Sequence, residues 1–290
     1  MTAERSTPAT AAEPRLLSLD AFRGGTMAAM ILVNNAGSSA VYEPLEHAEW
    51  HGWTFTDTIF PFFLWMVGVS ITFSFAKRVA RGDDRGRLFR HILQRSALIY
   101  LIGFLLVLIP KFDWAHVRIP GVLARIAVCY LIAGTIFLFT GWKGRLAALI
   151  GCLVSYWVLM MYVPVPGYGA GDLAMGHNFS NWVDGLALPN HLYARTKTWD
   201  PEGIVSTLPA VGTTLLGIFA GMLLRLENRS REEKTAWLFF AGNLLVFAGM
   251  ILATWMPINK KLWTDSFCLF MGGLAAITFA SCYWMIDVQG

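Results

Sequence analysis

The stretch TDTIFPFFLWMVGVSITFSF at residues 56–75 has a single charged residue, Asp57. An α-helix needs about 20 mostly apolar residues to cross a hydrocarbon core of roughly 30 Å, so this stretch predicts a transmembrane helix. Similar apolar blocks recur along the chain, at 19–35, 56–75, 97–109, 122–139, 146–162, 204–224, 237–255 and 266–285. The third is short and is expected to begin nearer Ile92. The sequence therefore predicts an all-α, polytopic transmembrane helical bundle with about eight spans.

The composition supports a membrane protein. Of the 290 residues, 56% are hydrophobic and 14% are charged, whereas soluble domains average about 25% charged residues. The first block is not expected to be a cleaved signal peptide, because Asp20, Arg23 and Asn34 interrupt it and no small-residue cleavage site follows. It should remain in the mature protein.

Basic residues predict the orientation of the chain, because Lys and Arg are enriched in cytoplasmic loops. With the N-terminus inside, sixteen of the 23 basic residues lie on inner segments and six on outer ones, and Arg125 lies within a span. We expect an integral membrane protein with a cytoplasmic N-terminus. The net charge of +4 reflects this topology rather than affinity for nucleic acid, and the basic run 77–95 is predicted to be a solvated loop facing lipid headgroups.

The rest of the chain organises around these spans. Residues 1–14, rich in Ala, Thr and Pro, predict a disordered cytoplasmic tail, and residues 15–290 a transmembrane domain. The outer segment 163–203 is long enough to fold over the mouth of the bundle, and its Gly, Pro and Asn clusters argue against a continuous helix. The four cysteines fall inside apolar blocks without metal-ligand spacing and are expected to be small buried hydrophobes.

Ionisable groups in or beside membrane spans are costly in lipid and mark candidate functional sites. They are Asp20, Arg23, His47, Asp57, Arg125, Lys260 and Lys261. On the predicted topology all but Asp20 and Arg23 lie toward the outer side, so the chemistry is expected in the outer half of the membrane. Asp20 and Arg23 are three residues apart on one helical face and also fit a simple intrahelical ion pair.

His47 is the strongest candidate for catalysis. An imidazole titrates near neutral pH and can take a proton from an attacking amine or hydroxyl, and Asp57 could orient it. Alternatively, Asp57 is a first-turn acid favoured by the helix dipole. His51 invites a metal-site interpretation, but it shares an irregular Trp-rich loop with His47 and lacks the usual zinc motif, so no metal is expected.

Other polar residues have two interpretations each. Asn34 and Asn35 end the first span, where an amide either caps the helix or binds a substrate carbonyl and steadies an oxyanion; capping is the simpler expectation. Arg125 could pair with an acid such as Asp57 or meet an anionic part of a ligand.

Several longer motifs occur in order along the chain. They are LSLDAFRG at 17–24, LVNN at 32–35, HAEWHGWT at 47–54, FPFF at 60–63, RIPGVLARIA at 118–127, DPEG at 200–203, STLPA at 206–210 and PINKKLWT at 257–264. From about Arg15 to the end, the chain thereby resembles the heparan-alpha-glucosaminide N-acetyltransferase family and its bacterial relatives. Because those relatives usually carry further C-terminal spans, we expect a C-terminally incomplete transmembrane acyltransferase domain.

The resemblance implies transfer of an acetyl group from cytoplasmic acetyl-CoA, the co-substrate, to an amino sugar or glycan acceptor on the outer side. The implied location is a bacterial inner membrane. The expected partners are the acceptor and the lipid bilayer, without nucleic acid, and a homodimer is one candidate assembly. The acetyl-CoA arm must then thread into the bundle and deliver its thioester near the outer face.

The resemblance also implies roles for residues. His47 matches the essential histidine and would deprotonate the acceptor amine or carry the acetyl group briefly, while Asn34 would polarise the thioester carbonyl. Arg125 and Lys260 would line the outer cavity, and the pair at 20 and 23 would lie nearer the CoA entrance. The implied catalytic set is His47, Asn34 and Asp57, and the cofactor-binding set is Asn35, Arg125, Lys260, Asp20 and Arg23.

Two other classes of function fit parts of the pattern. In an ion-coupled transporter or permease, Asp57, Arg125 and the Asn pair would form an intramembrane ion site, although no inverted repeat is evident. In a structural or assembly protein, the polar residues would only hold helices together. Acetyl-CoA-dependent labelling of an acceptor separates the first class from these two.

Overall fold

The computed structural model describes residues 16–35, 37 and 40–290, so the predicted tail at 1–14 lies outside the described residues. Within this part, apart from isolated bridges, the regular structure is helical. The helices are α1 Leu17–Asn34, η1 Glu43–Leu45, α2 Phe55–Ala80, α3 Arg85–Leu108, α4 Val122–Phe139, α5 Trp142–Tyr162, α6 Phe179–Ala187, α7 Thr207–Leu224, α8 Arg231–Leu252, α9 Asp265–Tyr283 and the π-helical η2 Trp284–Val288. The predicted all-α bundle is confirmed.

Seven helices of the described chain are long and apolar enough to cross a membrane: α2, α3, α4, α5, α7, α8 and α9 with η2. α1 has the length of a span at 18 residues, but Asp20, Arg23 and Asn34 make it more polar than these seven. The protein is therefore an integral membrane protein with several candidate spans, and membrane crossing by α1 stays a prediction.

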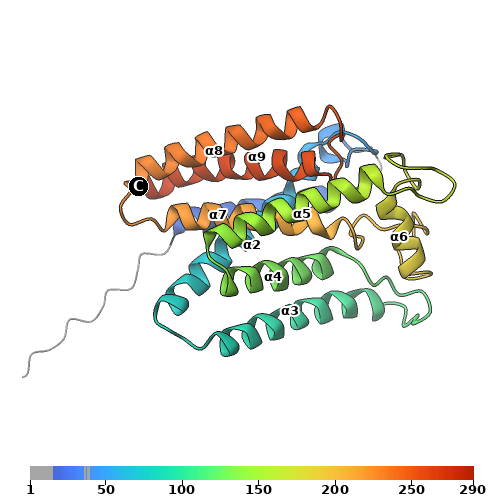
Figure 1. Ribbon diagram of the computed structural model, residues 1–290, viewed down its shortest axis with the longest axis horizontal. Helices are drawn as coiled ribbons and strands as arrows, with labels where there is room; N and C mark the ends of the chain where they lie inside the picture. The colour runs from blue at the N-terminus through green and yellow to red at the C-terminus, as the bar shows by residue number, and fades with distance from the viewer. Residues whose placement is uncertain (1–15, 36, 38–39) are drawn as a thin grey trace, which may run out of the picture.

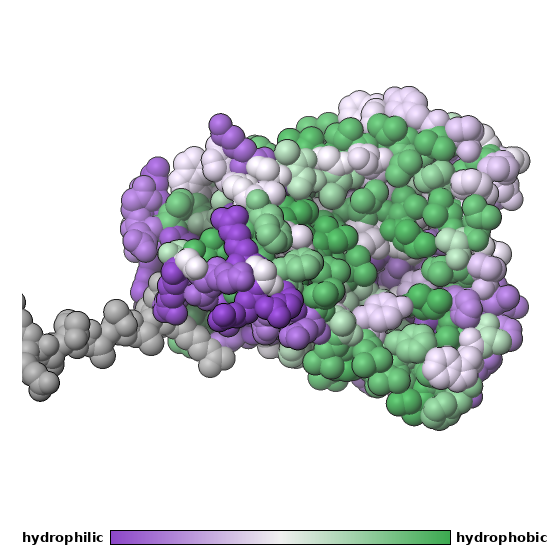
Figure 2. Space-filling view, turned by 60° about the horizontal axis from the view of Figure 1, so that its bottom comes forward, coloured by the Kyte–Doolittle hydropathy of each residue, from purple (hydrophilic) through white to green (hydrophobic). Residues whose placement is uncertain are grey.

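The long helices run side by side, and α6 lies with the longer connections at one end of the bundle, which we call the α6 end (Figure 1). α2 and α7 form the centre of the bundle. In their apolar 18-residue stretches, 61% and 67% of the residues are buried, against 17%, 17% and 22% in α3, α5 and α8. Apolar side chains cover the flanks, and hydrophilic ones gather toward the ends (Figure 2). This distribution suits a bundle whose sides face lipid.

α2 and α7 touch through their backbones. A Cβ atom added at Gly217 of α7 would lie 1.9 Å from the carbonyl oxygen of Trp65 in α2, which no side chain tolerates. About two helical turns after Trp65, the hydroxyl of Thr72 in α2 donates to the carbonyl oxygen of Ile218, the residue that follows Gly217, at 3.2 Å. Small residues at such contacts let membrane helices approach closely and gain van der Waals contact and interhelical hydrogen bonds.

The basic segment 77–95 differs from its prediction as a solvated loop. α2 continues to Ala80 and α3 already begins at Arg85, so the connection contains only residues 81–84. The physical reason is a helix cap: the carboxylate of Asp84 accepts the backbone N–H groups of Gly86 and Arg87 at 2.9 and 3.3 Å. The basic residues extend both helices beyond the apolar core, and α3 starts earlier than Ile92.

We expect Gly217→Ala to destabilise the bundle, because its methyl group would overlap the α2 backbone, which cannot move aside as a side chain would. Overpacking of this kind costs about 1–3 kcal/mol or more. Thermal unfolding of the purified protein in nanodiscs measures the loss. Gly151→Ala in α5 is the matched control, since a Cβ there meets no atom within 4 Å; equal stability of the two variants would contradict the proposed contact.

Candidate active site

A cavity of about 380 Å³ lies at the α6 end of the bundle. Four segments far apart in the sequence contribute its walls, and they include the predicted residues His47, Asp57 and Lys260. Its lining is His47, Ala48, Trp50, Asp57, Arg118, Val122, Met175, Tyr193, Arg195, Thr196, Trp199, Pro201, Glu202, Lys260, Lys261 and Trp263. We call this space the His47 cavity.

His47, Asp57 and Lys260 form a compact polar cluster in the wall of the cavity. Nδ1 of His47 lies 2.7 Å from Oδ1 of Asp57, and Nζ of Lys260 lies 3.2 Å from the same oxygen and 3.0 Å from Nδ1. The side chain of Asp57 is 1% exposed, that of Lys260 18% and that of His47 53%. The buried acid thus joins a partly buried cation to an imidazole that remains open to the cavity.

The hydrogen-bond donors and acceptors of this cluster decide which ring nitrogen of His47 carries the proton. Nδ1 cannot both donate to the carboxylate and accept from the ammonium of Lys260, and 2.7 Å from a carboxylate is a donor distance. Assigning the proton to Nδ1 leaves Nε2 of His47 unprotonated and able to act as a base. Lys260 then pairs with Asp57; burial lowers the pKa of Lys260, and the charge of Asp57 opposes that effect.

Asp57 also caps the helix that carries it. Its Oδ2 accepts the backbone N–H groups of Ala48 and Thr54 at 3.0 and 3.1 Å, and Thr54 and Asp57 complete a capping box at the start of α2. The contact with His47 and the first-turn cap therefore both occur, one at each carboxylate oxygen, and a role for Asp57 in catalysis stays a prediction.

A tight loop before α9 presents Lys260 and forms the floor of the cavity. Asn259 is fully buried, and its Oδ1 accepts the backbone N–H of Leu262 at 3.0 Å. Trp263 has a φ of 51°, which is rare for a bulky residue, and its indole N–H donates to Thr213 at 3.0 Å. Backbone strain of this kind is typical of functional sites.

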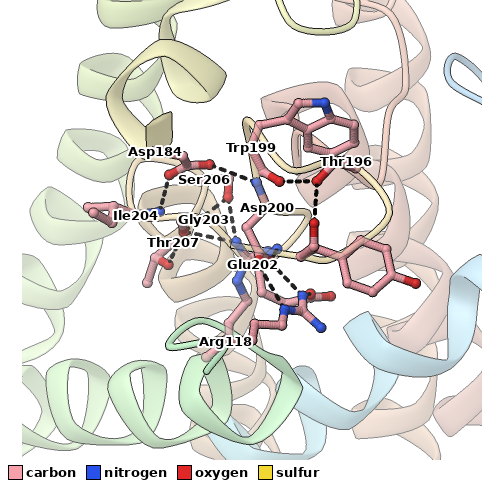
Figure 3. A network of polar contacts seen from close by, with 12 residues as sticks. Arg118, Asp184, Thr196, Trp199, Asp200, Glu202, Gly203, Ile204, Ser206 and Thr207 are labelled. Atoms are coloured by element: carbon pink, nitrogen blue, oxygen red, sulfur yellow. Dashed lines mark hydrogen bonds and ion pairs between the residues drawn. The ribbon is translucent and has the colours of Figure 1, made fainter. Parts of the chain in front are cut away.

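Another part of the wall is held by an acidic network around Arg118 (Figure 3). Nε of Arg118 donates to Oδ2 of Asp200 at 2.7 Å, and its Nη2 donates to Oδ1 at 2.5 Å and to Oε2 of Glu202. Burial opposes the charge of Arg118, but these acids outweigh it and raise the pKa of the guanidinium. Glu202 lines the cavity, whereas Asp200 lies behind it.

Asp184 at the end of α6 fixes the turn that carries these acids. Its carboxylate accepts the backbone N–H of Ile204 at 2.9 Å and of Asp200 at 3.3 Å. A Cβ at Gly203 would lie 2.0 Å from the same carboxylate, so any other residue there would displace the carboxylate from these N–H groups. The DPEG motif is thus a turn wrapped around a buried acid.

Arg125 has neither the expected contact with Asp57 nor the expected place in the lining of the outer cavity, and its contact with an anionic part of a ligand stays a prediction. It is not among the residues that line the His47 cavity, and no contact with Asp57 occurs among the described residues. Its guanidinium lies under the floor, 5.2 Å from the ring of Trp263, and donates to Ser206 and, at 3.1 Å, to the carbonyl oxygen of Gly203. Lys260 takes the position beside Asp57 because its loop reaches over α2, whereas Arg125 points into the bundle.

Asn34 and Asn35 lie at the exposed end of α1, away from the lining of the His47 cavity. The amide of Asn35 donates to the carbonyl oxygen of Ile31 at 2.8 Å and its backbone N–H bonds to Leu32, which is the capping arrangement. The structure does not bring either amide to His47.

A second cavity of about 440 Å³ lies among α1, α2, α3 and α4, and we call it the Arg23 groove. Arg23 pairs with Asp20 at 3.1 Å, as the spacing predicts, and also donates to Ser70 at 3.3 Å. The polar lining is Arg23, Ser70, Ser74, Arg95 and Tyr130, and the rest is apolar. Val122 lines the His47 cavity and Leu123 the groove, so the first turn of α4 borders both.

Sequence reasoning assigned no role to Arg118, Glu202 or Trp263, although each lines the His47 cavity. Each of them lies in one of the motifs RIPG, DPEG and PINKKLWT, which were the signal in the sequence that could have identified them. Two more His–Asp pairs, His116 with Asp113 at 3.0 Å and His177 with Asp172 at 3.1 Å, lie outside this lining.

Asp184 should make stability depend on pH. Burial raises its pKa from 3.8 to about 6, against the lowering effect of the two backbone N–H groups. The folded state therefore binds this proton more tightly than the unfolded state, and its stabilising effect, full below the unfolded pKa, is lost as pH rises through about 6. The contribution is on the order of 3 kcal/mol.

Unfolding temperatures of the wild type and Asp184→Asn in nanodiscs between pH 4 and 7 test this expectation. The wild type should lose stability relative to the variant as pH rises. A difference that does not change with pH would contradict it.

Comparisons with known proteins agree with this architecture. The family model described as "Heparan-alpha-glucosaminide N-acetyltransferase, catalytic" matches residues 15–256. Heparan-alpha-glucosaminide N-acetyltransferase of Homo sapiens is 30% identical over an alignment of 336 residues. This alignment includes 97% of this chain and 50% of the relative. The Mus musculus protein of the same name is 28% identical over 331 residues, covering 95% and 50%. The chain thus spans about half the length of these curated relatives, and it belongs to the heparan-alpha-glucosaminide N-acetyltransferase catalytic family.

Proposed function

We propose that this chain carries the acyl-transfer site of a membrane-bound acetyltransferase. The donor is acetyl-CoA from the cytoplasmic side, and the acceptor is an amino sugar or glycan at the α6 end, on the outer side of the membrane. The observation that carries the proposal is the His47–Asp57 contact of 2.7 Å in the wall of a cavity of about 380 Å³. A base oriented by a buried acid is the arrangement that activates a nucleophile.

The walls of the cavity suit a sugar. Its lining contains the aromatic residues Trp50, Tyr193, Trp199 and Trp263, and the indoles of Trp50 and Trp199 meet edge to face with their centroids 5.3 Å apart. Such rings offer apolar surface to the C–H faces of a pyranose, while the charged residues around them can bind its hydroxyl and amino groups.

The transfer step needs one base. Nε2 of His47 takes a proton from the acceptor amine, whose nitrogen attacks the thioester carbonyl carbon. The C–N bond forms, the C–S bond breaks, and the leaving thiolate of CoA receives a proton from the imidazolium. Asp57 neutralises the imidazolium while it exists and holds the ring so that Nε2 faces the cavity. In the alternative route Nε2 itself attacks the thioester and carries the acetyl group to the acceptor.

The Arg23 groove is the proposed path of the donor. Arg23 and Arg95 supply positive charge for CoA phosphates, and the apolar remainder of the lining accommodates the pantetheine arm. Because the first turn of α4 borders both cavities, a thioester at the end of this arm would approach His47 there. CoA itself then never needs to leave the cytoplasmic side.

The remaining assignments rest on the family resemblance. Asn34 as the group that polarises the thioester carbonyl, and Asn35 beside it, require α1 to end nearer His47 when the substrates are bound. The bacterial inner membrane and a homodimer stay predictions of the same kind.

His47→Ala should abolish acetyl transfer while the protein remains folded, because no other lining residue holds an imidazole against a carboxylate. The measurement is turnover of acetyl-CoA with glucosamine as trial acceptor, using purified protein in nanodiscs. His116→Ala is the matched control: it also removes a histidine paired with an aspartate at 3.0 Å, but outside the cavity.

Full activity of a correctly folded His47→Ala variant would sink the proposed role. Absence of acetyl-CoA turnover in the folded wild type would sink the proposed function of this chain.

The orientation can be tested by labelling. Lys197 in the segment before α7 and Arg229 before α8 are both exposed and lie on opposite predicted sides. In intact cells, a membrane-impermeant maleimide should label Lys197→Cys, and should label Arg229→Cys only after permeabilisation. The wild type is the control, since its four cysteines are buried or partly buried. The reverse pattern would mean that the proposed sides are exchanged.

A further inference from the structure

We propose that Glu202 selects an amine over a hydroxyl in the acceptor, by placing one free carboxylate oxygen in the His47 cavity. The inference rests on the proposed function, because the acceptor is assumed to bind where His47 can reach it. It assigns to Glu202 a role in recognition, whereas its contact with Arg118 alone would suggest a role in folding.

The argument begins with the charges that line the cavity. Its cations are Arg118, Arg195, Lys260 and Lys261, and its acids are Asp57 and Glu202. Both oxygens of Asp57 are already engaged, Oδ1 by His47 and Lys260 and Oδ2 by the backbone of the capping box. Asp57 therefore has no lone pair directed at a ligand.

Glu202 differs in this respect. Its Oε2 accepts from Arg118, whereas Oε1 has no hydrogen bond within the described chain and is not a buried unpartnered atom. The side chain is 12% exposed and belongs to the cavity lining. One oxygen is thus fixed by the protein, and the other is available to a ligand.

Arg118 also binds Glu202 through fewer atoms than it binds Asp200. Arg118 uses two of its nitrogens on Asp200, which is 1% exposed, and shares only one of them with Glu202. Of the two carboxylates around this guanidinium, Glu202 is the one that reaches the cavity, and its charge also acts on Arg125 and Lys260. A protonated amine is the group that this charge attracts, and a hydroxyl gains much less because it carries no charge.

Binding of the acceptor as an ammonium is compatible with the transfer step, because every proton that it loses is accounted for. An amino sugar that binds as an ammonium donates one N–H to Oε1 of Glu202 and gives one proton to Nε2 of His47. The free amine then attacks the thioester, and the imidazolium gives its proton to the leaving thiolate of CoA. The proton that the nitrogen loses on forming the amide passes to water, which can reach a cavity where the side chain of His47 is 53% exposed.

The test compares Glu202→Gln with Asp200→Asn, the matched control. Both variants remove a carboxylate charge from Arg118 in the same turn, but only Glu202 lines the cavity. Binding of D-glucosamine and of D-glucose is measured by saturation-transfer NMR in nanodiscs without acetyl-CoA, and KM for glucosamine and for acetyl-CoA by turnover.

Glu202→Gln should weaken glucosamine binding and raise its KM about 10- to 100-fold, the factor for one hydrogen bond to a charged group. It should leave glucose binding and the KM for acetyl-CoA unchanged. Asp200→Asn should keep the preference for glucosamine over glucose, even where folding yield falls, and Glu202→Asp should keep part of it.

The outcomes separate this inference from the proposed function. A wild type that transfers acetyl groups, together with a Glu202→Gln variant that keeps its amine preference, overturns the inference alone. A preference that Glu202→Gln abolishes, in a folded protein without transfer, supports the inference and overturns the proposed transfer. A wild type that binds glucosamine no better than glucose overturns the inference whatever the turnover.

Discussion

The α6 end of the bundle depends on one buried carboxylate, that of Asp57. Its two oxygens hold the N-terminus of α2, the loop that carries His47 and the loop that carries Lys260. A carboxylate that is 1% exposed is stable only while such donors surround it, since an unpaired buried charge is costly. The site is therefore complete only when segments more than 200 residues apart in the sequence have come together.

The direction of the helices also favours negatively charged groups at the α6 end. α2, α4, α7 and α9 all begin at the α6 end, so their unpaired N–H groups and the positive ends of their dipoles point the same way. Such an environment favours acids and developing negative charge, including the oxyanion of an acyl transfer. It helps to accommodate Asp57 and Glu202 at one end of a strongly apolar bundle.

The spans could be predicted because residence in lipid demands only length and apolar composition. Their ends were less accurate, since caps such as Asp84 and the Ser230–Glu233 box carry helices beyond the apolar blocks. The His47–Asp57 contact was foreseeable at a separation of ten residues. The wall built by Glu202 was not, because nothing local in the sequence reveals which distant turn faces which loop.

The contact between α2 and α7 sets how freely the sequence can change. Lipid tails accept almost any apolar side chain, so the flanks of α3, α5 and α8 tolerate extensive divergence, as 30% identity to a relative requires. Where the backbone of Gly217 meets Trp65, even one methyl group is excluded. We therefore expect residues on the lipid-facing surface to be substituted quickly in evolution. Residues where the two central helices touch should hardly change.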